Sequence, residues 1–186
     1  MSLTNSSKLC RLIVDECPID GYGMKLLAAA RKLWMSQGKL VVTNPAELAD
    51  YSVIQIIGGE PMNYPARVLQ LVTGLKLLNS RVKIKLYTGF PDVENLLKIA
   101  PFVDCISITL STPEDENHFR VQRLGFRDFG DTRMEVRYNS ATGEDPHGRV
   151  FEKYWSLIDM AAVGDYLLTS SAKVIKLGNK TLFDGN

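Results

Sequence analysis

Two glycines, an acidic residue and a proline follow a short apolar run and form the stretch best suited to bind a ligand. Residues 52–57 are rich in branched side chains, as is typical of a strand buried on both faces of a parallel sheet. Gly58 and Gly59 then allow a sharp turn with uncovered backbone groups, before Glu60 and Pro61. In α/β folds, small molecules bind beyond the carboxyl ends of parallel strands. A carboxylate there suits a ligand's ammonium group, whereas in the plainer interpretation Glu60 is a surface residue in a turn.

Further candidate residues lie near the ends of later strands. Thr88 begins a Thr-Gly turn at what would be the same edge of the sheet. Ser107 and Thr109 alternate along an apolar segment, and hydroxyls inside a barrel could bond a ribose, although Thr is also an ordinary strand former. Arg137 and Asn139 end the next strand. An arginine directed into a barrel needs an anionic partner, whereas on the outer face it has no such meaning.

The cysteines and histidines offer few ligands for a metal. Cys17 lies in a loop, whereas Cys10 and Cys105 lie inside predicted strands and are interpreted as small buried core residues. Three cysteines at unrelated spacings argue against a disulfide framework. His118 and His147 lie in polar segments without a second ligand at metal spacing. We also find no nucleophile elbow, phosphate-cradling loop or zinc motif.

Composition favours one ordinary domain over residues 1–186. The chain has 45% hydrophobic residues and a net charge of +1, which suggests neither a nucleic-acid partner nor a membrane surface. No apolar run approaches the ~20 residues of a membrane span. Residues 1–7 lack the apolar region of a signal peptide, so a cytoplasmic protein is expected. The expected partner is a small-molecule ligand or a protein substrate.

Strand-like and helix-like segments alternate five or six times along the chain. The segments with strand character are 8–16, 40–42, 52–57, 82–87, 102–110 and 133–139, with 165–168 as a sixth barrel strand. The helical segments are 24–37, 63–79, 92–99 and 150–163. Asn44 and Asp92 are expected to start helical turns. Lys83 and Lys85 are interpreted as a solvated strand face.

Alternation of this kind predicts a parallel sheet with right-handed crossovers. Sequential strand order would give a curved partial barrel, and reversed order a doubly wound sheet; periodicity does not choose between them. A closed eight-stranded barrel needs ~250 residues, so the chain is too short for one. Residues 173–183, with Gly178 and Asn179 at their middle, predict a terminal β-hairpin.

In their order along the chain, these features resemble the radical S-adenosylmethionine superfamily over roughly residues 8–140. The matching features are the loop at Cys17-Pro18, the stretch Gly58-Gly59-Glu60-Pro61, the turn Tyr87-Thr88-Gly89-Phe90 and the strand at 103–110. The resemblance implies an α/β fold, a (βα)6 TIM-like partial barrel, with ligands at the carboxyl ends of the strands. The chain is similar in length to the small activating enzymes that install glycyl radicals.

The resemblance also implies roles for the candidate residues and S-adenosylmethionine as the cofactor. Glu60 and the two glycines would receive the ammonium group of its methionyl part. Arg137 and Asn139 lie where the family often places contacts to ribose or carboxylate. The implied cofactor-binding residues are Gly58, Gly59, Glu60, Pro61, Thr88, Ser107, Thr109, Arg137 and Asn139.

The sequence departs from the family at the cluster loop. The pattern Cys-x3-Cys-x2-Cys, laid on the chain from Cys17, places Gly21 and Met24 where two of three thiolates should ligate a [4Fe–4S] cluster. Glycine has no ligand atom and methionine is a weak thioether ligand, so the metal site would retain only Cys17.

Three hypotheses follow. The first is a degenerate relative that binds S-adenosylmethionine or a related nucleoside without a normal cluster site, or serves as a silent scaffold. The second is an active radical enzyme whose cluster ligands are supplied unusually. The third is an unrelated α/β binding domain.

Overall fold

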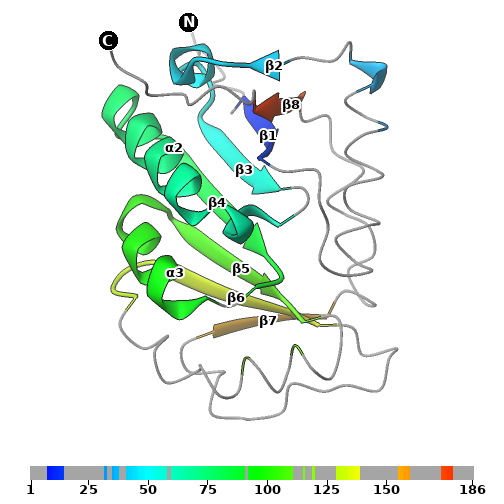
Figure 1. The fold of residues 1–186 in the computed structure, drawn as a ribbon, viewed down its shortest axis with the longest axis vertical. Coiled ribbons are helices and arrows are strands. Elements are labelled where there is room, and N and C mark those ends of the chain that lie inside the picture. Colours follow the sequence, from blue (N-terminus) through cyan, green and yellow to red (C-terminus); the bar gives the residue numbers. More distant parts are fainter. Residues whose placement is uncertain are drawn as a thin grey trace, which may run out of the picture.

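In the computed structural model, the residues described are 8–14, 32, 35–37, 41–57, 60–90, 92–110, 115, 119, 129–138, 155–159 and 173–177. They form one sheet of eight strands (Figure 1). The strands are β1 (Leu9–Ile13), β2 (Val41–Val42), β3 (Val53–Ile57), β4 (Lys83–Thr88), β5 (Cys105–Thr109), β6 (Arg133–Tyr138), β7 (Trp155–Asp159) and β8 (Lys173–Leu177). Between them lie the helices α2 (Pro65–Leu78) and α3 (Val93–Ile99) and the 3-10 turns η1 (Pro45–Leu48), η2 (Pro61–Asn63) and η3 (Ala100–Phe102).

Every pairing in this sheet is parallel, which confirms the predicted α/β class. The order is β2-β8-β1-β3-β4-β5-β6-β7, so the strands from β3 to β7 follow β1 in chain order. The sheet is not closed, and β2 and β7 are its two edge strands. Because the strands are parallel, their carboxyl ends share one edge, and residues that follow β3, β4, β5 and β6 are neighbours there.

Helices α2 and α3 cover one face of the sheet (Figure 1) and pack against each other. In α2, Pro65 occupies the first turn, where its missing N–H is not needed, and apolar residues recur at helical spacing. In α3, the side chain of Asp92 caps the helix by accepting a hydrogen bond from the Asn95 amide, as predicted. The core shared by strands and α2 includes Leu12, Ile54, Ile56, Ile84, Leu86, Ile106, Ile108, Val136, Val68, Leu71, Val72 and Leu75.

Two of the predicted elements are wrong. Residues 155–159, inside the predicted helix at 150–163, form the strand β7, which pairs with β6 from Met134 to Tyr138. The open edge of β6 offers unpaired backbone groups. The short apolar segment 155–159 is compatible with either helical or strand periodicity. It therefore forms a strand here, because a strand can pair with those backbone groups of β6. The predicted sixth strand at 165–168 lies outside the described residues.

The prediction of a terminal β-hairpin at residues 173–183 is also wrong for its first strand, which is β8. This strand lies between β1 and β2 and is parallel to both, so it does not pair with the chain that follows it. The register with β1 extends from Lys173 to Lys176, and the register with β2 includes Lys176 and Leu177. Sequence proximity favoured a local turn, whereas the tertiary structure places the segment beside the first strand.

None of the helices described in the chain has both the length and the apolar content needed to cross a bilayer.

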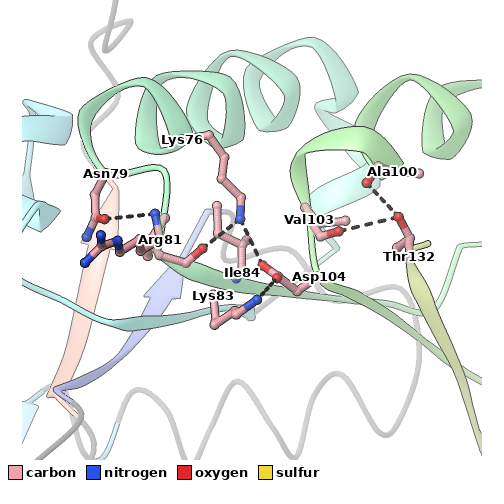
Figure 2. A network of polar contacts seen from close by, with 10 residues as sticks. Lys76, Asn79, Arg81, Lys83, Ile84, Ala100, Val103, Asp104 and Thr132 are labelled. Carbon is pink, nitrogen blue, oxygen red and sulfur yellow. Dashed lines mark hydrogen bonds and ion pairs between the residues drawn. The ribbon is translucent and has the colours of Figure 1, made fainter. Parts of the chain in front are cut away.

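A polar network ties α2 to the amino ends of β4 and β5 (Figure 2). Asp104 is its centre: one carboxylate oxygen accepts a hydrogen bond from Lys83 Nζ at 2.7 Å. The other oxygen accepts from Lys76 Nζ at 3.0 Å and from the Ile84 amide at 2.9 Å. Burial opposes ionisation of Asp104, but these hydrogen bonds outweigh it and lower the pKa of the carboxyl below its ordinary value.

We expect Asp104→Asn to lower the free energy of unfolding by about 1–2 kcal/mol at pH 7, because the amide keeps only part of these bonds. The pKa of the folded state lies below the ordinary value of 3.8. The stabilisation by ionised Asp104 is therefore fully present above the unfolded-state pKa of 3.8. It is lost as pH falls from there through the folded-state pKa. Urea unfolding from pH 7 to pH 3 should show the two proteins converging. The control is Glu94→Gln, which removes the exposed i,i+4 pair with Lys98. A difference that does not change with pH would contradict this role for Asp104.

Candidate functional site

The face of the sheet opposite α2 and α3 carries a buried cluster of polar side chains. Alternate residues of a strand point to opposite faces, and parallel register pairs Lys85 with Cys105, Tyr87 with Ser107 and Ser107 with Glu135. Their neighbours Leu86, Ile106 and Val136 belong to the helix-covered core. We call the residues Lys85, Tyr87, Ser107, Glu135 and Arg137 the polar cluster, and the surface they share the polar face.

Direct contacts join the polar cluster across β4, β5 and β6. Lys85 Nζ lies 2.5 Å from Glu135 Oε2, and Arg137 Nε donates a hydrogen bond to Ser107 Oγ at 3.0 Å. The Tyr87 ring has Lys85 Nζ at 4.9 Å and Arg137 Cζ at 4.9 Å from its centroid, so two cations contact one aromatic ring. The five side chains therefore form one connected group rather than separate pairs.

Glu135 is the ionised centre of this group. It is 3% exposed, and burial alone would raise the pKa of its carboxyl. The hydrogen bond from Lys85 and the charges of Lys85, Arg133 and Arg137 outweigh burial and lower that pKa. Burial raises the pKa of Tyr87, so its phenol keeps its proton at neutral pH. The cluster thus combines one carboxylate, two cations and two hydroxyl groups.

Lys85 corrects one prediction from the sequence. The side chain of Lys83 is 70% exposed, as a solvated strand face requires, but that of Lys85 is 21% exposed. Both lysines lie on the same face by alternation. Lys85 differs because the pairing of β4 with β5 begins at this residue, and β6, the strand beyond β5, provides Glu135 as its counter-ion.

Arg137 lies on the polar face near its carboxyl edge. It is 9% exposed, and its guanidinium contacts the Ser107 hydroxyl and the Tyr87 ring. No salt bridge joins Arg137 to a carboxylate of the described residues. Thr109, its register partner on β5, is also buried. Arg137 therefore lies within the field of the Glu135 carboxylate, but its direct side-chain contacts among the described residues are to a hydroxyl and an aromatic ring.

Glu60 and Thr88 form a second group at the same edge. Glu60 is 2% exposed, and its Oε1 accepts hydrogen bonds from the Met62 amide at 2.8 Å and from the Thr88 hydroxyl. Its Oε2 accepts from the Gly89 amide at 2.7 Å. Thr88 has the same alternation as Leu86, so its side chain lies on the other side of the sheet from Tyr87.

The predicted ligand-binding residues are thus divided between two places. Ser107, Thr109 and Arg137 share the polar face, whereas Glu60 and Thr88 contact each other at the edge, and Pro61 opens η2 beside them. The predicted residues Gly58, Gly59, Asn139 and Cys17, with the aligned positions Gly21 and Met24, lie outside the described residues.

Sequence reasoning missed Lys85, Tyr87 and Glu135 as members of the site. The available signal was the alternation of charged and apolar residues in β6, where Arg133, Glu135 and Arg137 are separated by Met134 and Val136. Such a strand has one apolar and one charged face. The sequence did not show that the charged face is buried, because that depends on the neighbouring strands.

The two described thiols are poor cluster ligands. Burial raises the pKa of Cys10 to about 12 and that of Cys105 to about 12, so both stay protonated at neutral pH. An iron–sulfur cluster needs thiolates. Both cysteines are buried, as predicted, but only Cys10 belongs to the apolar core, whereas Cys105 lies on the polar face. Among the residues that the structure describes, no group of three or more His, Cys, Asp or Glu side chains could hold a metal ion.

Comparison with protein-family models gave no match, and neither did a search of the curated proteins. The class of protein is therefore defined by the fold and the site alone. It is an α/β domain with an all-parallel open sheet, one face of which carries a buried polar cluster near the carboxyl edge.

Proposed function

We propose that this chain is a radical S-adenosylmethionine-like domain with a partial-barrel sheet. It binds S-adenosylmethionine or a related nucleoside and has no normal [4Fe–4S] site. The order of the strands from β3 to β7 after β1 supports this proposal, because a TIM-like partial barrel adds its parallel strands one after another. The sequence motifs at Gly58-Gly59-Glu60-Pro61 and at Thr88 support it from the family side.

The observation that carries the proposal is the buried polar face at the carboxyl halves of β5 and β6. Ser107 is fully buried, Thr109 is 5% exposed and Arg137 is 9% exposed, although none of them lies in the apolar core. Burying polar side chains is costly unless hydrogen bonds compensate for the lost water. Arg137 and Ser107 provide one such bond to each other, a ligand with matching groups would add others, and ligand sites of α/β sheets lie at this edge.

The chemistry of these side chains matches a nucleoside that carries an amino acid. The hydroxyls of Ser107 and Thr109 can exchange hydrogen bonds with ribose hydroxyls. The planar guanidinium of Arg137 suits a carboxylate, which it can bind through two parallel hydrogen bonds. S-adenosylmethionine offers both groups, and its sulfonium would supply the reactive centre when bound.

The described thiols do not fit the iron–sulfur cluster of active family members, because Cys10 and Cys105 are buried and protonated. Because Cys17 is the one cysteine at the aligned cluster positions of the sequence, we propose a binding function and derive no radical step.

Isothermal titration calorimetry with S-adenosylmethionine tests the proposal. Arg137→Ala removes a charge-assisted contact worth ~1.5–3 kcal/mol, so the affinity should fall about 10- to 100-fold. The matched control is Arg133→Ala, on the same face of the same strand but at its other end, with a side chain that is 64% exposed. The control should bind like the wild type. The proposal would be refuted if the wild type gave no binding heat with S-adenosylmethionine. It would also be refuted if Arg137→Ala and Arg133→Ala bound the ligand with equal affinity.

A further inference from the structure

The carboxylate of Glu60 is engaged within the chain rather than directed toward a ligand. Among the described residues, three donors bond to it: the Met62 amide, the Thr88 hydroxyl and the Gly89 amide. The residue is 2% exposed, and Met62 is also buried. Both carboxylate oxygens therefore already accept hydrogen bonds from the described chain.

The three donors come from two different turns. Met62 lies in η2, directly after β3, whereas Thr88 and Gly89 belong to the end of β4. Through Glu60, the chain leaving one strand is fastened to the chain leaving its neighbour, 28 and 29 residues away. Glu60 therefore holds two parts of the carboxyl edge at a fixed separation.

Thr88 extends this connection by one more bond. Its hydroxyl accepts a hydrogen bond from the Phe90 amide at 2.9 Å and donates to Glu60 Oε1. The same oxygen also lies 3.1 Å from the Phe90 carbonyl, but a hydroxyl has one proton, and a carboxylate is a stronger acceptor than a carbonyl. The turn from Thr88 to Phe90 is thus ordered by a short relay that ends on the carboxylate.

We propose that Glu60 is a positioning residue, which fixes the turns after β3 and β4 and does not itself contact the ligand. The calorimetric part of the test rests on the proposed function, because it measures ligand affinity. The hydrogen-exchange part does not. It differs from the role implied by family resemblance, in which Glu60 receives the ligand's ammonium group.

Thr88 provides the decisive comparison. Its side chain lies away from the polar face, so Thr88→Val affects a ligand there only through the turns, whereas Thr88→Ser keeps the hydroxyl. Amide hydrogen exchange is measured at Met62, Gly89 and Phe90 in Glu60→Ala, Thr88→Val and Thr88→Ser. Calorimetry with S-adenosylmethionine is done on the same proteins. The control is Glu47→Ala, another carboxylate that accepts backbone hydrogen bonds, from Thr43 and Asn44 in the capping box of η1.

We expect exchange at Gly89 to accelerate about tenfold or more in Glu60→Ala and measurably in Thr88→Val, but not in Thr88→Ser or the control. The affinity for S-adenosylmethionine should fall in Glu60→Ala and Thr88→Val and be restored in Thr88→Ser. Unchanged exchange at Gly89 in Glu60→Ala would overturn the inference. Affinity lost in Glu60→Ala but kept in Thr88→Val would overturn it as well, because it indicates direct contact. If the wild type binds no ligand, the proposed function fails, and the exchange data alone still decide the role of Glu60.

Discussion

Replacing Glu135 by glutamine is expected to lower the free energy of unfolding by about 3 kcal/mol. The carboxylate is 3% exposed and neutralises Lys85 at 2.5 Å, with Arg133 Nη2 at 3.5 Å from its other oxygen. In the variant, the positive charges of Lys85 and Arg137 would remain on a buried face without their counter-ion. The cost is the penalty of a partly desolvated cation rather than the worth of one hydrogen bond.

Urea unfolding at pH 7 measures this change, and a second substitution separates its causes. In the double variant Lys85→Met with Glu135→Gln, one uncompensated cation is removed, so part of the lost stability should return. Lys83→Met is the matched control, because its side chain lies on the same strand and face but is 70% exposed. If the Glu135→Gln variant were as stable as the wild type, water would be solvating the charges of Lys85 and Arg137 in place of the carboxylate. The position would then not be buried as described.

Ile106→Ala is expected to lower the free energy of unfolding by about 3–4 kcal/mol. Ile106 lies in β5, is fully buried and belongs to the core between the sheet and the helices. Truncation removes three methyl or methylene groups and leaves a cavity that well-packed neighbours fill only in part. Ile106→Val, which removes one carbon, should cost about 1 kcal/mol.

The same urea experiment checks this prediction. The control is Leu77→Ala in α2, where the side chain is 83% exposed and its loss should change stability by less than about 0.5 kcal/mol. A similar cost for Ile106→Ala and Leu77→Ala would mean that the apolar face of β5 is not packed beneath α2 and α3. Together with the Glu135 variant, the result compares the two faces of one sheet.

Local patterns in the sequence determined most of the described elements. The apolar spacing of Val68, Leu71, Val72 and Leu75 predicted α2, and Asp92 predicted the start of α3. Alternation or apolar runs predicted the strands from β1 to β6. These signals are reliable because they depend on neighbours three or four residues away in a helix, or two residues away in a strand.

Elements at the margin of the sheet were not determined in this way. Residues 155–159 were expected to be helical and form β7, and residues 173–177 were expected in a hairpin and form β8 between β1 and β2. A short apolar segment is compatible with either periodicity, and its conformation depends on which strand edge is open beside it. That edge is formed by chain far away in the sequence.

The candidate site shows the same division. The sequence by itself identified Glu60, Thr88, Ser107, Thr109 and Arg137 as polar residues near the carboxyl ends of parallel strands. Only the tertiary structure placed Lys85 against Glu135, 50 residues away, and the Thr88 hydroxyl against Glu60, 28 residues away. Sequence alternation gives the face on which a side chain lies, but not which strands stand next to each other. Burial and charge pairing depend on that strand order, which long-range packing decides.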